Sequence, residues 1–161
     1  NVKRIPVLDD QGEPVTVKKT GFPKFVNGYE CAYCKAQLKA SGKVEGSKYK
    51  PLYAVDHIVG GHSLRTFDDV GSFVKAIISV RPTDLQILCH ICHDIKTHSE
   101  KIGISFEMAT YDKVAISLVN AKTDKDFFLE RSLPVPSNQK LRREGIVKVL
   151  EQENKKNKRS K

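Results

Sequence analysis

Short apolar runs bounded by Gly, Pro and polar residues predict several strands in the first hundred residues. Residues 1–20 are expected to be extended with one internal turn, and Asn27-Gly28 is expected to form a second turn. The apolar positions of LYAVDHI, residues 52–58, and of LQIL, residues 85–88, predict two short strands. Residues 41–50, SGKVEGSKYK, are polar and rich in Gly and Ser, which is typical of a loop.

Apolar residues at helical spacing predict one amphipathic helix between these two strands. Thr66 and Asp69 match the capping-box pattern that opens a helix, and Pro82 is expected to end it. A second helix, with a polar outer face, is expected to begin at His93. The apolar stripe of the first helix consists of Val70, Phe73, Val74, Ile77 and Ile78.

The last third of the chain predicts three further helices. Residues 108–121 fit a helix or a strand, with the helix favoured, and residues 123–133 contain a short helix. After a linker with two prolines, Ser137 is expected to cap a long helix that has one apolar stripe and basic outer faces. Residues 154–161 are expected to be disordered because they are almost entirely polar and basic.

Charge points to a polyanionic partner. The 161 residues suffice for one domain with a real core, and the net charge of +9 favours nucleic acid. A cationic surface kept for solubility is the alternative. Residues 132–161 hold nine Lys and Arg against three Glu, so much of the excess lies there. No stretch resembles a secretory signal or a membrane span, so we expect a cytoplasmic protein without a membrane partner.

Two C-x2-C pairs carry the strongest spacing signal in the chain. Two such knuckles supply the four sulfur ligands of a tetrahedral zinc site, with Zn–S bonds of about 2.3 Å. A redox pair needs only one knuckle beside a βαβ pattern, and a disulfide framework suits a secreted protein, so a structural zinc ion is favoured. The expected ligands are Cys31, Cys34, Cys89 and Cys92.

Four histidines lie near these motifs and have different expected roles. His90, inside the second knuckle, is expected to face solvent, although it competes as a zinc ligand. His98 is expected at the surface near a helix end. His62 is a loop residue, an additional metal ligand or a phosphate contact. His93 directly follows a cysteine, at a helix start from which its side chain can reach a neighbouring hairpin.

The order of CAYC, then VDHI, then DLQILCHICHDIKT resembles the zinc-stapled branch of the HNH endonucleases, and the long insertion looks like phage-encoded members. The resemblance covers residues 28–100. It implies an α+β fold with a ββα-metal (His-Me finger) nuclease core stapled by the four-cysteine zinc site, a helical insertion and C-terminal helices. The core is expected over residues 21–105, and a helical extension with a basic tail over residues 106–161.

The resemblance also assigns catalytic roles. It implies that Asp56 and His93 bind one catalytic divalent ion, Mg2+, Mn2+ or another, and that His57 is the general base that takes a proton from water. A neutral imidazole suits that task near neutral pH, and a divalent ion neutralises charge at the phosphate. Asp84 stands where the family usually has Asn. We expect it to serve the catalytic site by holding the loop of the base as an acceptor or by orienting His57.

The implied function is hydrolysis of DNA phosphodiester bonds, by nicking or double-strand cutting, in a monomer or weak homodimer. If the chain is phage-encoded, it works in the host cytoplasm. The rival is a non-catalytic zinc-ribbon DNA-binding protein with a degenerate HNH site, and an RNA-directed nuclease or an adaptor is less favoured. The residues expected to contact DNA are Lys96, Arg142, Arg143 and Lys148.

Overall fold

The computed structural model describes residues 2–159 except positions 8, 10, 12, 41, 44–48, 51, 61–63 and 65. It contains both helices and strands, in agreement with the expected mixture of α and β structure. The chain separates into two compact units, Asn1–Asp94 and Ile95–Lys161. The boundary between the units falls inside the helix His90–Ile102, which lies entirely within the expected core of residues 21–105. The limits of a nuclease core stay a prediction.

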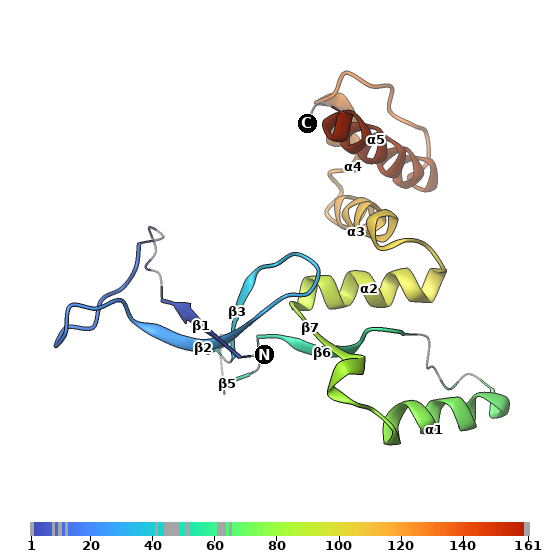
Figure 1. The fold of residues 1–161 in the computed structure, drawn as a ribbon. Coiled ribbons are helices and arrows are strands. Elements are labelled where there is room, and N and C mark those ends of the chain that lie inside the picture. The colour runs from blue at the N-terminus through green and yellow to red at the C-terminus, as the bar shows by residue number, and fades with distance from the viewer. Residues whose placement is uncertain are drawn as a thin grey trace. The chain divides into compact units, whose positions relative to one another are not determined.

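An antiparallel sheet occupies the N-terminal part of the first unit, in the order β1 (Lys3–Pro6), β2 (Phe25–Glu30) and β3 (Gln37–Lys39) (Figure 1). The predicted turn at Asn27-Gly28 is wrong, because both residues lie inside β2. A Cβ on Gly28 would lie 2.1 Å from Ile5 Cδ1 and 2.4 Å from the Leu38 carbonyl oxygen. The glycine therefore serves close packing of three strands rather than a turn.

The predicted loop at residues 41–50 is also wrong in part. β4 (Gly42–Lys43) and β5 (Tyr49–Lys50) pair in antiparallel fashion. Backbone pairing of these two-residue strands overrides the Gly- and Ser-rich composition from which the loop was predicted. The other residues of this stretch lie outside the described part of the chain.

Both strands predicted around the Asp-His motif are confirmed. β6 (Ala54–His57) and β7 (Leu85–Leu88) form an antiparallel pair in which Asp56 lies opposite Gln86 and His57 opposite Leu85. The intervening residues contain a 3-10 turn η1 (Phe67–Asp69), the helix α1 (Val70–Ile78) and a second 3-10 turn η2 (Pro82–Asp84). The first strand therefore ends at the residue proposed as the base.

The capping pattern of the predicted helix is confirmed at the first turn. The Asp69 carboxylate accepts hydrogen bonds from the Thr66 backbone N–H at 2.7 Å and from the Thr66 hydroxyl at 2.9 Å. The chain enters α1 through η1, and the helix ends at Ile78, before Pro82 opens η2. None of the residues of α1 is buried, and Ile77 and Ile78 of its apolar stripe are 59% and 77% exposed.

The helix α2 (His90–Ile102) begins three residues earlier than predicted. The His93 backbone N–H donates to the Cys89 carbonyl oxygen at 2.9 Å, so the second knuckle itself forms the first turn. His93 therefore lies within that turn and does not open the helix. The predicted start of the helix at His93 is too late because the residues of the second C-x2-C knuckle are themselves helical.

The second unit continues with α3 (Phe106–Asn120), α4 (Asp124–Leu129) and α5 (Gln139–Arg159), and the helices predicted there are confirmed (Figure 1). Its buried cluster consists of Ala115, Phe127, Phe128 and Ile146. Leu118, Val135, Val147, Val149 and Leu150 pack around that cluster. None of the described helices combines the length and the apolar character that crossing a membrane requires.

Two predictions for α5 are wrong. Asn138 rather than Ser137 caps it, since the Asn138 Oδ1 accepts the Leu141 N–H at 2.8 Å. Residues 154–159, expected to be disordered, form the last turns of the helix. An ion pair of 2.8 Å between Lys158 and Glu107 holds this end against α3, which charge counting alone did not reveal.

We predict that Gly28→Ala destabilises the protein by more than the roughly 1–3 kcal/mol typical of overpacking, because a backbone oxygen cannot move aside as a side chain can. Urea unfolding followed by circular dichroism measures the change. Gly71→Ala in α1 is the matched control, since nothing lies within 4 Å of its added Cβ. The control should be neutral or stabilising by up to about 1 kcal/mol. Equal stabilities of the two variants would contradict the packing role.

Candidate functional site

Four cysteine sulfurs converge from two distant parts of the first unit. Two of these residues follow β2 and two flank the junction of β7 with α2. Their Sγ atoms all lie within 4.8 Å of one another, and the Cys34 and Cys89 Sγ atoms are 3.8 Å apart. A tetrahedron with bonds of about 2.3 Å has edges of about 3.8 Å, so the spacing fits zinc. The members of the cluster are Cys31, Cys34, Cys89 and Cys92.

Backbone hydrogen bonds orient the sulfurs. The Cys89 N–H donates to Cys31 Sγ at 3.4 Å, and the Cys92 N–H donates to Cys89 Sγ at 3.3 Å. Such contacts fix the ligands of a metal site and favour their thiolate forms. The backbone N–H of Ala32 donates to the Ile87 carbonyl oxygen at 2.9 Å, which joins the first knuckle to β7.

The thiols differ in their affinity for protons. Burial raises the pKa of Cys31, but hydrogen bonds from the backbone N–H groups of Cys89, Cys34 and Tyr33 outweigh it and bring the pKa to about 6. Burial and the neighbouring sulfurs raise the pKa of Cys92. Four thiolates at this spacing repel one another, so a divalent ion is the natural counter-charge. A metal held by all four has no open position, which fits a structural role.

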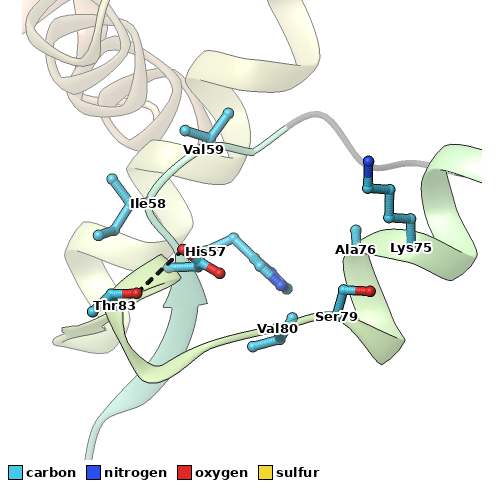
Figure 2. Close-up of a pocket in the computed structure, with 9 residues that line it drawn as sticks. His57, Ile58, Val59, Lys75, Ala76, Ser79, Val80 and Thr83 are labelled. Atoms are coloured by element: carbon cyan, nitrogen blue, oxygen red, sulfur yellow. Dashed lines mark hydrogen bonds between the residues drawn. The ribbon is translucent and has the colours of Figure 1, made fainter.

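A hollow of about 300 Å³ lies beside the end of β6. The imidazole of His57 points into it, opposite the last turns of α1 (Figure 2). Asp84, at the end of η2, also lines the hollow. The structure thus brings together the two residues that the sequence analysis assigned to the catalytic site.

Asp84 accepts hydrogen bonds from several donors of its own turn. The Arg81 backbone N–H donates to it at 3.0 Å, the Arg81 guanidinium at 3.3 Å and the Thr83 hydroxyl at 3.4 Å. The backbone bond and the guanidinium of Arg81 lower the pKa of the Asp84 carboxyl. The Ile58 N–H donates to the Asp84 carbonyl oxygen at 2.9 Å. The segment that follows His57 is therefore held by the Asp84 backbone carbonyl, whereas the carboxylate holds only its own turn. The catalytic role of the Asp84 side chain stays a prediction.

Gln86 contacts both residues of the Asp-His pair, and the sequence analysis assigns it no role. Its Nε2 donates to the Asp56 carboxylate at 3.2 Å and to the His57 carbonyl oxygen at 3.4 Å. One amide on β7 thereby contacts the Asp56 side chain and the His57 backbone. The LQIL motif contained the signal, but Gln86 was given no role there.

Asp56 and His93, the expected ligands of a catalytic ion, are both half-buried. Neither lines the hollow that contains His57. Among the described residues, the four cysteines are the only group of three or more metal-ligating side chains close enough to share an ion. The catalytic-ion roles of Asp56 and His93 stay predictions. His62 lies outside the described residues.

Several predicted DNA contacts are engaged in ion pairs. Lys96 is only 5% exposed and pairs with Glu100. Arg142 pairs with Asp124 and also donates to the backbone oxygens of Pro136 and Ser137. Lys148 is exposed on α5. Lys148 is thus the best placed of the predicted set to meet a phosphate, and the DNA-binding roles stay predictions.

The buried carboxylate of Asp112 contacts two further basic residues. Arg143 donates to both carboxylate oxygens of Asp112, at 2.8 and 2.6 Å, and His98 lies 2.8 Å from the same carboxylate. His98, expected at the surface, is therefore half-buried, because its ring hydrogen-bonds to Asp112, fourteen residues away in the sequence. The hydrogen bond from Arg143 lowers the pKa of Asp112, and His98 lowers it by a smaller amount. Burial of the carboxylate raises the pKa but is outweighed. The ionised Asp112 therefore stabilises the folded protein fully at pH values above the pKa of Asp in the unfolded chain. This stabilisation is lost as the pH falls through the lowered pKa of Asp112 in the folded protein.

No protein-family model, no curated protein and no solved structure matches this chain.

We predict one tightly held zinc ion per chain. Cys31→Ser should lose the zinc and unfold the first unit, because structural zinc supplies about 10–16 kcal/mol of binding free energy in small domains. Elemental analysis and circular dichroism measure both effects. His90→Ala is the control for a histidine ligand, since His90 is exposed on α2 and should not be needed for zinc. Stoichiometric zinc in a folded Cys31→Ser protein would rule out the four-cysteine centre.

We further predict that Arg142→Ala lowers stability by about 1.5–3 kcal/mol, the range for hydrogen bonds to charged groups. The reason is that Asp124 would keep its burial without its partner. Lys148→Ala, which removes an equal charge from the exposed face of α5, should leave stability unchanged. Thermal unfolding separates the two. Equal melting temperatures would show that the Arg142 ion pair does not stabilise the fold.

Proposed function

We propose that this chain is an HNH-type endonuclease that hydrolyses DNA phosphodiester bonds with the help of a divalent ion. The observation that carries the proposal is the position of His57. It ends β6, and its ring points into a hollow that Asp84 also lines. A half-buried histidine whose ring lines a hollow is suited to accept a proton from a water molecule bound in that hollow.

The order of elements supports the same proposal. β6 pairs with β7, and the chain then passes directly through the second knuckle into α2, which carries His93 in its first turn. This strand–strand–helix order, with an Asp-His pair on the first strand, is the order that the HNH resemblance implies. The four-cysteine cluster ties β7 and α2 to the end of β2, so it would hold the site residues on a stable frame.

The donor set suits a catalytic ion. Asp56 would supply carboxylate oxygen and His93 imidazole nitrogen, a mixture that accepts Mg2+, Mn2+ or a later metal. The hydrogen bond from Gln86 to Asp56 is the kind of contact that orients a ligand carboxylate. When bound, such an ion would neutralise charge that develops at the phosphate.

The chain's own residues would do the remaining work. His57 would take the proton of the attacking water, while Gln86 holds the His57 backbone through its carbonyl oxygen. Asp84 would keep the segment after His57 in place through its hydrogen bond with the Ile58 N–H. The excess of basic residues favours DNA as the polyanionic substrate.

We predict that the protein nicks supercoiled plasmid with Mg2+ or Mn2+, and that His57→Ala lowers the rate by about 10²–10⁴-fold, the typical contribution of a general base. Agarose electrophoresis of the plasmid forms measures the rate. His90→Ala is the matched control and should nick as the wild type does. Chelation mild enough to leave the thiolate-bound zinc should abolish nicking, and added Mg2+ or Mn2+ should restore it.

The rival function, a non-catalytic zinc protein that binds DNA, makes the opposite prediction. It requires that the folded, zinc-loaded wild type binds DNA without nicking it under any divalent ion. Cleavage of RNA but not of DNA would move the proposal to an RNA-directed nuclease. Undiminished nicking by His57→Ala would show that His57 is not the base.

A further inference from the structure

The helix α1 presents two unlike stripes. Ser72, Lys75, Ala76 and Ser79 recur at intervals of three and four residues, so they share one face. Three of them, beginning with Lys75, line the hollow that contains His57. The apolar residues of the predicted stripe lie on the opposite face and are largely exposed. The helix therefore turns its small and polar face toward the hollow and its apolar face away.

The same face of α1 lines a second hollow of about 590 Å³. This hollow shares Lys75, Ala76, Ser79 and Asp84 with the first and adds Ser72 and Arg81. The shared wall makes the two spaces neighbours along one face of the helix. His57 therefore lines the first hollow, and Lys75 lines both.

Among the described residues, Lys75 is the cation on this wall that has no role in stabilising the fold through an ion pair. It is exposed, and it makes no ion pair with any residue that the structure describes. Arg81, the other cation of the second hollow, pairs with Asp84 at 3.3 Å. That pair also compensates the charge of Asp84, the acid of the two hollows. Among the described residues that line the two hollows, Lys75 is therefore the one uncompensated cation that an anion beside His57 would meet.

We propose that Lys75, with the Ser79 hydroxyl one turn further along, binds a backbone phosphate of the DNA strand that lies beside His57. The inserted helix is thus the wall that positions the strand. The inference rests on the proposed endonuclease function. It adds a substrate-binding residue that does not belong to the cysteine and histidine motifs from which that function is proposed. Ammonium and hydroxyl donors at i and i+4 on one helix face suit a phosphate, and they read no base sequence.

Salt dependence of DNA binding tests the proposal. A labelled DNA duplex is titrated with His57→Ala protein, which should cut about 10²–10⁴-fold more slowly than the wild type, over a series of salt concentrations. Fluorescence anisotropy gives the affinity. Adding Lys75→Ala should weaken binding roughly tenfold, as expected for one charged contact. It should also reduce the slope of log K against log salt by about 0.9. Lys75→Arg should restore both.

Lys19→Ala is the matched control, because Lys19 is an exposed lysine of the same unit that lines neither hollow. It should leave slope and affinity unchanged. In otherwise wild-type protein, Lys75→Ala should raise KM for plasmid nicking more than it lowers kcat. If the wild type nicks DNA and Lys75→Ala behaves as Lys19→Ala does, the phosphate-binding role is overturned and the nuclease stands. If the wild type neither binds nor nicks, both proposals fail.

Discussion

The convergence of four sulfur atoms is the constraint on which the first unit depends. Among its described residues, the buried apolar side chains are Ile5, Cys31, Leu88 and Cys92, and two of these belong to the sulfur cluster. So small a core buries too little apolar surface to offset the conformational entropy of folding. A metal bound by the cluster would supply the missing free energy and would join the end of β2 to the junction of β7 with α2.

The ion pairs determine which basic residues remain for a partner. A net charge of +9 suggests a broadly cationic surface, yet several of the most prominent cations serve the fold. Arg142 and Arg143 hold α5 to buried acids, and Lys96 pairs along its own helix. Because removing either arginine would leave an acid without its partner, such a variant tests stability before it tests DNA binding. Exposed lysines such as Lys75 and Lys148 give a cleaner measurement.

Sequence patterns predicted features that depend on local spacing. The C-x2-C pairs, the strands around Asp56 and the capping box of Thr66 and Asp69 all follow from neighbouring residues, and the structure contains each of them. The capping box opens η1, through which the chain enters α1. The failures depend on contacts between distant residues. Asn27-Gly28 predicts a turn, but the close approach of β1 and β3 to Gly28 is the reason that this position has no side chain. Likewise, the end of α5 is held by Glu107, a residue far away in sequence.

The Asp84 carboxylate is neutralised by an arginine of its own turn. An asparagine would offer one acceptor oxygen, whereas the two oxygens of Asp84 receive the Arg81 N–H, its guanidinium and the Thr83 hydroxyl. The carboxylate and Arg81 thus form one neutral unit at the end of η2. Its neutrality matters for an anionic substrate, since an unpaired carboxylate beside His57 would repel a phosphate. In the proposed nuclease, an acid at the position where the family usually has an amide would thus be neutralised by an arginine of the same turn.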